Sequence, residues 1–370
     1  MRKRLLRPTF LGLSSAALLL GCSTELDIND EYKDVTIVYG LLNQRDSLHF
    51  LKINKAFLGE GDAFQMALVA DSSEYRGEAI QSAVVERVNA AGAVVETYTL
   101  RDTLVSNREP GTFYAPEQKL YYFRTPFAQE LPPGTNGTPM YLWQDDTYRL
   151  SLVVNGRAIT ATAPITNDYP IDAVDFNTEP NQSSNRVRLR NDQGTSYVNY
   201  EFNWKSRADC KRYEVSYRFR YDEVVGGDTI PKSITRRIGT KVSSFQNEDM
   251  AILLSGESFF SAINSQIKSE PGWQNATRRI FRGLDFLTTV ANDDYHIYLT
   301  LSEPVTGIVN ERPVYSNIDG AYGVWGSRYT KAVIGKRLST QTLEELKNGP
   351  YTADLLFCSA LDPGGAYSCD

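Results

Sequence analysis

The stretch Tyr213-Glu-Val-Ser-Tyr-Arg-Phe-Arg-Tyr221 alternates strictly between apolar and polar side chains. A period of two places every second side chain on the same face of a β-strand, so we expect one face of this segment to be buried and the other to be wet. Gly226-Gly227-Asp228 supplies a turn, and residues 229–238 resume the strand pattern. The sequence therefore predicts a long β-hairpin within a mainly β protein.

Helices are rare on either side of this hairpin. One is predicted near residues 256–267, where Ser255 is a good cap and apolar residues recur at helical spacing. A shorter helix is predicted over residues 343–347, with Thr342 as its cap. The remaining segments of this half are predicted as strands: residues 171–176, 186–190, 197–204, 284–290, 295–301 and, as a final edge strand, 351–358.

The N-terminal half consists of short strand segments separated by turns. Asn155-Gly156 is its strongest hairpin signal, because both central positions of a type I′ turn need a positive φ. Seven or so short strands predict an immunoglobulin-like β-sandwich over residues 33–168, joined by a linker near Pro164 and Pro170. A second β-rich domain is predicted over residues 169–336, followed by a C-terminal helix and edge strand over 337–370. The strands predicted for the sandwich cover residues 34–42, 48–54, 78–87, 93–100, 113–115, 120–124, 147–154 and 158–163.

The beginning of the chain has the pattern of a secretory signal. Basic residues precede an apolar run over residues 10–20, which ends in Leu19-Leu-Gly-Cys22. The run is too short to span a bilayer, and its end resembles the bacterial lipobox. We therefore expect cleavage of residues 1–21 and acylation of Cys22; the alternative is an ordinary cleaved signal peptide with an incidental cysteine.

Residues 22–32 are predicted to be an acylated acidic tether, with four acids between Glu25 and Glu31. Acids behind the acylated cysteine resemble the surface-export signal of Bacteroidota lipoproteins, although a solvated tether facing the periplasm has the same composition. Removal of residues 1–21 takes away four positive charges and moves the formal net charge from −6 to −10. This charge disfavours nucleic acid as a partner. The expected location is the outer membrane, with the domains facing the cell surface.

Three cysteines remain after Cys22. Cys358 and Cys369 lie eleven residues apart with Pro-Gly-Gly between them, so the chain can turn back on itself. In an oxidising compartment this spacing predicts a disulfide that fastens the C-terminus. Cys210 is expected to be a buried thiol, and no cysteine spacing suggests a zinc site.

Five segments resemble a family of Bacteroidota outer-membrane lipoproteins of unknown function. The most specific is the signature Ser316-Asn-Ile-Asp-Gly320 with Gly323-Val-Trp-Gly326. The others are short segments in the first strand, the second hairpin, the strand pair that ends the sandwich and the start of the longer helix. The first strand and the cysteine-bearing tail depart from the family pattern. The resemblance implies a β-rich, lipid-anchored protein that accompanies envelope transport systems, and it transfers no catalytic residue.

No catalytic motif stands out, and we expect no enzymatic activity, cofactor or metal. His49 and His296 lie in predicted strands and are expected to be cross-strand surface residues. The acidic pairs Asp145-Asp146 and Asp293-Asp294 fit solvated turn caps, with calcium binding as the alternative. The glycines of residues 318–326 are expected to serve tight turns or close packing.

Aromatic residues near turns are the remaining candidates for binding. Exposed aromatic rings can stack on sugars or anchor protein interfaces, although strands also use aromatics as core. The candidates are Tyr141, Trp143, Tyr322 and Trp325.

These observations favour a non-catalytic accessory or docking subunit of an envelope transport or secretion complex, with an outer-membrane barrel protein as its partner. The first alternative is a surface module that binds glycan or peptide through exposed aromatics. The second is an envelope hydrolase, which requires two carboxylates about 5–10 Å apart in a deep cleft.

Overall fold

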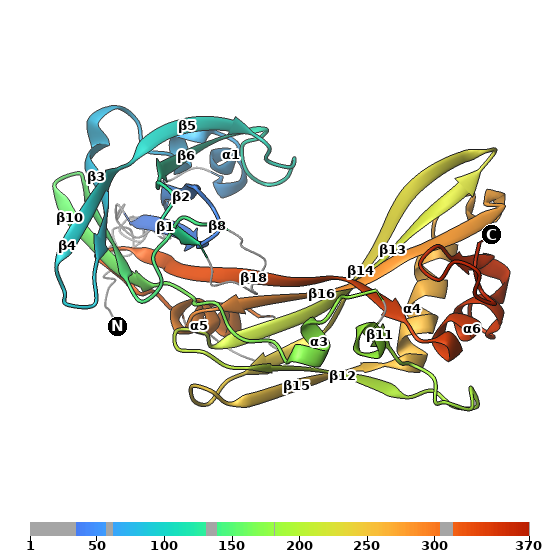
Figure 1. The fold of residues 1–370 in the computed structure, drawn as a ribbon. Helices are drawn as coiled ribbons and strands as arrows, with labels where there is room; N and C mark the ends of the chain where they lie inside the picture. Colours follow the sequence, from blue (N-terminus) through green and yellow to red (C-terminus); the bar gives the residue numbers. More distant parts are fainter. Residues whose placement is uncertain (1–34, 57–61, 131–138, 181, 304–313, 370) are drawn as a thin grey trace, which may run out of the picture.

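The computed structural model describes residues 35–56, 62–130, 139–180, 182–303 and 314–369. The protein is mainly β, with two sheets that dominate the molecule (Figure 1). Within the described residues, the larger sheet has ten strands in the order β14-β13-β16-β18-β1-β2-β6-β5, with β11 added beside β18 and β19 beside β16. Its members are β1 (Thr36–Leu42), β2 (Leu48–Lys55), β5 (Arg101–Ser106), β6 (Glu117–Arg124), β11 (Arg186–Val187), β13 (Arg212–Val225), β14 (Asp228–Val242), β16 (Arg278–Ala291), β18 (Tyr322–Leu338) and β19 (Phe357–Ser359).

The second sheet and the small sheets complete the strands. Five strands pair in the order β17-β10-β9-β3-β4. They are β3 (Ile80–Val88), β4 (Val94–Thr99), β9 (Thr147–Val154), β10 (Arg157–Pro164) and β17 (Ile318–Asp319). Two further pairs are formed by β12 (Asn199–Lys205) with β15 (Asp249–Ser255), and by β7 (Gln129–Glu130) with β8 (Pro139–Met140).

The helices are short. The longest is α4 (Gly256–Lys268), and Ser255 caps it by accepting a hydrogen bond from the amide of Ser258, as predicted. The other α-helices are α1 (Ala63–Ala67), α2 (Ala70–Ser73), α3 (Ala173–Phe176), α5 (Asp293–Ser302) and α6 (Thr340–Asn348). Single 3₁₀ turns cover Gly77–Ala79, Ser183–Asn185, Trp273–Asn275 and Ala353–Leu355. None of the described helices is long and apolar enough to cross a membrane.

The N-terminal part is a two-layer sandwich. The β9–β10 hairpin turns at Asn155 and Gly156, which both have positive φ as the sequence predicts. The core between the layers takes Val38 and Leu51 from one sheet and Val85 and Leu150 from the other. The predicted hairpins β1–β2, β3–β4 and β9–β10 are therefore confirmed.

The sandwich also takes a strand from far along the chain. β18 pairs with β1 in parallel and with β16 in antiparallel, so one continuous sheet runs through both parts of the molecule (Figure 1). Gly323 permits the close approach to β1, because a Cβ there would lie 1.9 Å from the carbonyl oxygen of Val38. The domain boundary after residue 168 stays a prediction, and the connection itself is no exposed linker: Ile165, Thr166 and Tyr169 are fully buried or nearly so.

The second core is richer in aromatic side chains than the sandwich core. The hairpin β13–β14 forms as predicted, and the inward face of β13 places Tyr213, Val215, Tyr217, Phe219 and Tyr221 in this core. Helix α4 packs its apolar stripe against the same core. Cys210 is buried at its border, as predicted, and its thiol donates to the carbonyl of Asn167 at 3.3 Å.

Several predicted elements were wrong. Residues 295–301 lie in helix α5, because the side chain of Asn292 caps it and two acids favour its first turn. Residues 173–176 form α3 rather than a strand, since Asp172 accepts a hydrogen bond from the amide of Val174. Residues 113–115 form no strand, and β5, which was not predicted, pairs with β6 instead.

The C-terminal segment packs on the second core. Helix α6 starts three residues earlier than predicted and is capped by Ser339, while Thr342 accepts a hydrogen bond from the amide of Leu189. The predicted final strand is reduced to the three residues of β19, which pair with β16 in parallel. Cys358 and Cys369 are joined by a disulfide, with 5.0 Å between their Cα atoms.

Candidate functional site

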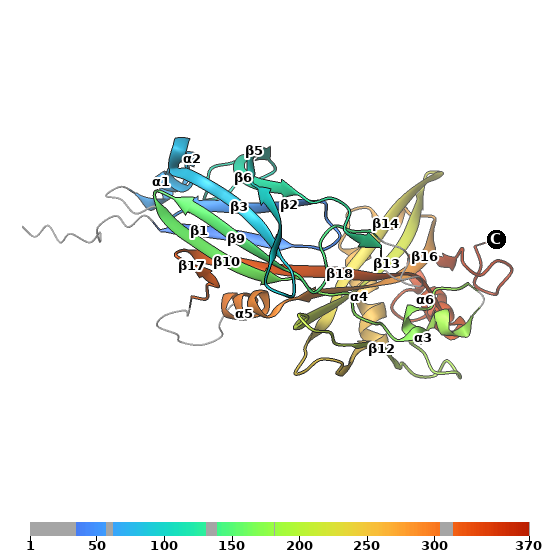
Figure 2. The ribbon, with the colours of Figure 1, turned by 60° about the vertical axis from the view of Figure 1, so that its left-hand side comes forward.

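The most distinctive surface is an aromatic groove on the outer face of β2, β1 and β18, beside helix α5. In both ribbon views α5 lies next to β18 (Figures 1 and 2). Strand alternation sets this face: Val38 points into the sandwich core, so Tyr39 points outward. The groove has a volume of about 420 Å³. The side chains that define it are Tyr39, Leu41, Leu48, Phe50, Tyr295 and Tyr298.

The rings of the groove contact one another and stay accessible. The ring centroids of Tyr39 and Tyr298 lie 6.0 Å apart in an edge-on arrangement, and Tyr295 stacks beside Tyr298 at 6.4 Å. Phe50 lies 6.1 Å from Tyr122 on the neighbouring strand. Tyr39 and Phe50 are 43% and 42% exposed, so both have ring surface available to a partner.

One buried amide side chain fixes α5 to the sheet and so builds one wall of the groove. The Oδ1 atom of Asn292 accepts from the amide of Tyr295 and from the amide of Ser327, both at 3.2 Å. Gly326 makes room for this contact, because a Cβ there would lie 3.0 Å from the same oxygen. The position of Tyr295 and Tyr298 is therefore set by the strand that completes the sandwich.

Charged side chains border the rings. Lys52, Asp46 and Arg328 line the groove, and the ammonium of Lys52 donates to the side chain of Gln118 at 3.0 Å. Burial lowers the pKa of Lys52 from its usual value. Burial is the main cause that raises the pKa of Tyr39 to about 12, and a hydrogen bond with Tyr298 is a second cause. The hydroxyl of Tyr39 therefore stays protonated and can donate a hydrogen bond. The groove thus combines apolar ring faces with hydrogen-bonding groups at its edge.

The four predicted binding residues do not form one site. Tyr322 is 52% exposed and lies on the same face of β18 as Val324, which lines the groove. Trp143 lies elsewhere, with the guanidinium of Arg87 4.7 Å from its ring, and Tyr141 packs edge-on against Phe127.

The prediction for Trp325 was wrong. Its ring is fully buried in the sandwich core, and its Nε1 donates to the carbonyl of Tyr148 at 2.8 Å. Gly40 leaves the space for the ring, because a Cβ there would lie 2.5 Å from it. Strand alternation separates Trp325 from Tyr322, since residues three apart on a strand point to opposite faces.

The sequence reasoning missed the other aromatic groove residues. Tyr39 lies in a predicted strand, next to the inward-facing Val38. The alternation of side chains along a strand would therefore have predicted that Tyr39 points outward. Tyr295 and Tyr298 were missed because residues 295–301 were predicted as a strand, whereas they form part of helix α5. In a helix these two residues are neighbours on one side, because side chains three apart meet.

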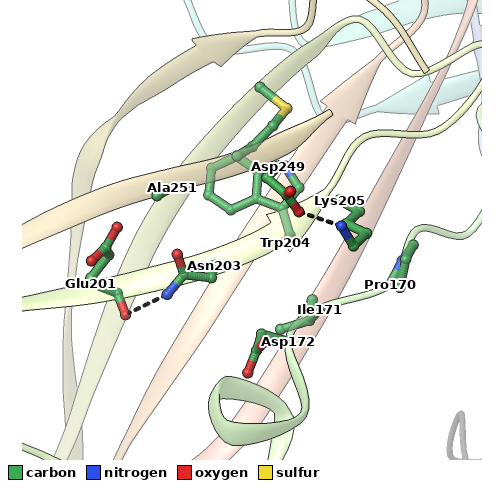
Figure 3. Close-up of a pocket in the computed structure, with 10 residues that line it drawn as sticks. Pro170, Ile171, Asp172, Glu201, Asn203, Trp204, Lys205, Asp249 and Ala251 are labelled. Carbon is green, nitrogen blue, oxygen red and sulfur yellow. Dashed lines mark hydrogen bonds and ion pairs between the residues drawn. The ribbon is translucent and has the colours of Figure 1, made fainter. Parts of the chain in front are cut away.

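A second hollow lies between residues 170–172, which lead into α3, and the β12–β15 pair (Figure 3). It has a volume of about 490 Å³, and its lining includes the three carboxylates Asp172, Glu201 and Asp249. Asp172 is engaged as the cap of α3, and Asp249 forms an ion pair with Lys205. Two of the three carboxylates therefore have structural partners.

The two histidines have different surroundings from those predicted. His49 is buried in the sandwich rather than exposed; it stacks on Phe123 at 4.7 Å, and its Nε2 lies 2.9 Å from the hydroxyl of Thr125. Burial lowers its pKa to about 4, so it is neutral at physiological pH. His296 lies on helix α5, where burial also lowers its pKa.

Three residues of the two acidic pairs are engaged by protein groups. Asp146 forms an ion pair with Arg87 at 2.7 Å, and Asp145 accepts a hydrogen bond from Asn167. At the start of α5, Asp294 accepts a hydrogen bond from Tyr315. Within the described residues, no group of three or more His, Cys, Asp or Glu side chains is arranged to hold a metal ion.

Comparison with known proteins gives little. No family model matches the chain, and no curated protein matches it. Among solved structures, the chain is similar to a DUF4785 family protein from Legionella pneumophila, with 10% sequence identity and a TM-score of 0.18. The match covers 69% of this chain and 52% of that protein, so the chain spans about half its length. At this score the likeness supports neither a fold nor a function.

Proposed function

We propose that this protein is a non-catalytic lipoprotein of the outer membrane that docks on a partner protein through the aromatic groove. In this role it is an accessory subunit of an envelope transport or secretion complex. The observation that carries the proposal is the exposure of Tyr39 and Phe50 on an ordered sheet face. The acylation of Cys22 and the tether of residues 22–32, which lie outside the described residues, supply the membrane anchor in this proposal.

The groove has the composition of a protein-binding hot spot. Tyrosine and arginine dominate such sites, which sit in small pockets bordered by polar groups. Tyr39, Tyr298 and Arg328 meet this description. The rings are also held by the sheet and by the fixed helix α5, so little side-chain freedom is lost when a partner covers them.

Site-specific crosslinking in growing cells tests the proposal. A photo-reactive amino acid replaces Phe50 in one tagged full-length protein and Phe245 in a matched control, because Phe245 is 66% exposed and lies far along the chain in the β14–β15 connection. We expect an adduct with one envelope protein from position 50 and none from position 245. Equal adducts from both positions, or none from position 50, would contradict the proposal.

A paired substitution adds a second readout. Tyr39→Ala with Phe50→Ala removes ring surface that is already partly exposed, so we expect unchanged folding and loss of the co-purifying envelope protein. Phe245→Ala is the control that should retain it. Co-purification that survives the double substitution would place the contact elsewhere on the molecule.

A glycan is the second candidate for the groove. The observation that favours it is the mixture of exposed rings with Asp46, Lys52 and Arg328, because sugars present both C–H faces and hydroxyls. A glycan array with the purified full chain tests this candidate. Binding that is lost in the Tyr39→Ala, Phe50→Ala protein supports a glycan, and a blank array leaves the protein partner as the occupant.

A further inference from the structure

A cluster of arginines occupies the outer face of the sheet at the opposite end from the sandwich. Arg218 and Arg220 lie two residues apart on β13, so their Cα atoms are about 7 Å apart and their side chains share one face. Arg282 on β16 joins them at an open hollow of about 520 Å³. Lys232 and Ser233 of β14 also line it.

A single buried carboxylate holds the first two arginines. The Nε of Arg218 donates to Oδ2 of Asp285 at 2.9 Å, and the Nε of Arg220 donates to the same atom at 2.9 Å. The Asp285 side chain is fully buried, and its Oδ1 also accepts from the amide of Gly335 at 2.9 Å. Two positive groups are therefore fixed by one negative group, which leaves an excess positive charge on the surface.

The geometry leaves donors of both guanidinium groups open to solvent. Arg218 and Arg220 are about one-third exposed, at 36% and 34%. Within the described residues, the hydrogen bonds of Arg220 go through Nε alone, so both of its Nη groups keep their N–H donors available. Gly283 makes room for this group, since a Cβ there would lie 2.7 Å from its Nη2.

The neighbouring charges do not cancel this excess. Asp222 also lines the hollow, but it pairs with Arg282 at 2.7 Å. Lys232 pairs with Glu223 at 3.4 Å and with Glu270. Glu223 is shared, because it also pairs with the buried Arg279 at 3.0 Å.

From this arrangement we propose that Arg218, Arg220 and Arg282 form a binding site for a phosphate monoester. Planar guanidinium groups that present paired N–H donors match the oxygens of a phosphate better than an ammonium does. Asp285 pre-orients two of them, so the site exists before the ligand arrives. The phosphate belongs either to a lipid headgroup or to a soluble phosphate ester, and the site chemistry is the same for both.

Titration of the full-length protein with inorganic phosphate tests the site. Binding is measured by isothermal titration calorimetry or from the NMR signals of the arginine Nε groups. The informative variant is Arg218→Lys with Arg220→Lys, because it keeps positive charge beside Asp285 and loses the paired donors. We expect phosphate affinity to fall about tenfold. Arg282→Gln, which does not touch Asp285, should weaken binding without disturbing the fold.

Arg188→Gln is the matched control, because Arg188 is a surface arginine paired with the single acid Asp192. It should bind phosphate as the unaltered protein does. The proposal is overturned if the unaltered protein binds no phosphate, or if the arginine variants and the control bind equally.

Vesicles distinguish the two sources of the phosphate. The protein is sedimented with two kinds of phosphatidylcholine vesicles of equal charge. One kind contains phosphatidate, which is a phosphate monoester, and the other contains phosphatidylglycerol, which is a diester. Stronger arginine-dependent binding to phosphatidate identifies a lipid headgroup. Phosphate binding without a preference for phosphatidate identifies a soluble ester. A failed crosslink at the aromatic groove would not count against the phosphate site, because the two surfaces share no residue.

Discussion

The two hydrophobic cores differ in how they are assembled along the chain. The second core takes all its buried members from Tyr169 onward, and it combines many aromatic rings with aliphatic side chains. The sandwich core is mostly aliphatic and takes Ile318 and Trp325 from the far end of the chain. Both halves form local hairpins, yet only the second core is complete within its own stretch of sequence. The sandwich therefore depends on the second half, and the reverse dependence is much weaker.

Substitution Trp325→Ala is the most direct way to break this dependence. Loss of a fully buried tryptophan is expected to cost about 3–5 kcal/mol of unfolding free energy. The hydrogen bond to Tyr148 is lost as well. Hydrogen exchange should accelerate in β9 and β10 far more than in β13. Tyr322→Ala, on the exposed face of the same strand, should change stability by less than about 0.5 kcal/mol; uniform acceleration across both cores would refute the comparison.

Substitution Arg279→Met probes the second core in the same way. Arg279 is 1% exposed, pairs with Glu223 at 3.0 Å and donates to the carbonyls of Leu355 and Trp273. Removing it leaves Glu223 buried without its closest partner, which is expected to cost about 3–5 kcal/mol in a denaturation experiment.

The control for this pair is Arg237→Met, because Arg237 and Glu214 form an exposed ion pair on the same sheet. Its expected cost is about 0–1 kcal/mol. The destabilisation by Arg279→Met should appear as faster exchange in the second core, with the sandwich strands β3 and β9 less affected. A sandwich that opens first in this variant would show that the dependence also runs the other way.

Acid should destabilise the sandwich more than the second core, because His49 is buried in the sandwich. Its pKa of about 4 in the folded protein lies below the usual value of 6.5, so between these values the unfolded chain binds a proton that the folded chain does not. Stability is therefore lost as the pH falls from about 6.5 to about 4. The loss reaches about 3 kcal/mol, at 1.36 kcal/mol per pKa unit.

Urea unfolding at a series of pH values measures this contribution. His49→Gln keeps a neutral hydrogen-bonding side chain beside Thr125 and should remove the extra loss, while the carboxylates contribute equally to both proteins. The two pH profiles are expected to diverge below pH 6.5. Parallel profiles would mean that His49 is protonated in the folded sandwich.

The smallest expected effect comes from the C-terminal disulfide. Cys358→Ser with Cys369→Ser opens a loop of eleven residues, for which chain entropy predicts a loss of about 2–3 kcal/mol. The effect should be confined to the second core, where Phe357 packs. Thermal denaturation of the double variant and of the reduced unaltered protein should agree. Unequal losses would show that one of the serines adds a cost of its own.

The sequence predicted hairpins well and the long strand β18 poorly. Alternation between Tyr213 and Tyr221 was sufficient for β13 because each strand position has a clear inward or outward preference. The glycines of residues 318–326 suggested turns or close packing, and the structure shows that Gly323 and Gly326 serve close packing inside β18. What these glycines approach, β1 and α5, cannot be known from the residues that precede or follow them.

The aromatic groove could be predicted only in part, for the same reason. Tyr322 was a candidate because it is an aromatic residue near a predicted turn, and it does lie on the outward face. Tyr39 and Tyr298 come together only through the pairing of β1 with β18 and the capping of α5 by Asn292. A site built from segments this far apart leaves no local pattern in the sequence.

The pairing of Ile37 with Tyr322 also determines when the molecule can finish folding. As the chain emerges from synthesis or export, β1 appears early and its partner strand arrives 285 residues later. Until then one edge of β1 offers unpaired backbone groups, which is the condition that promotes association between chains. Contacts of such long sequence separation also slow folding, because the intervening loop must close first. A strand made late, β18, thus completes the sandwich, and the edge of β1 stays unpaired until β18 arrives.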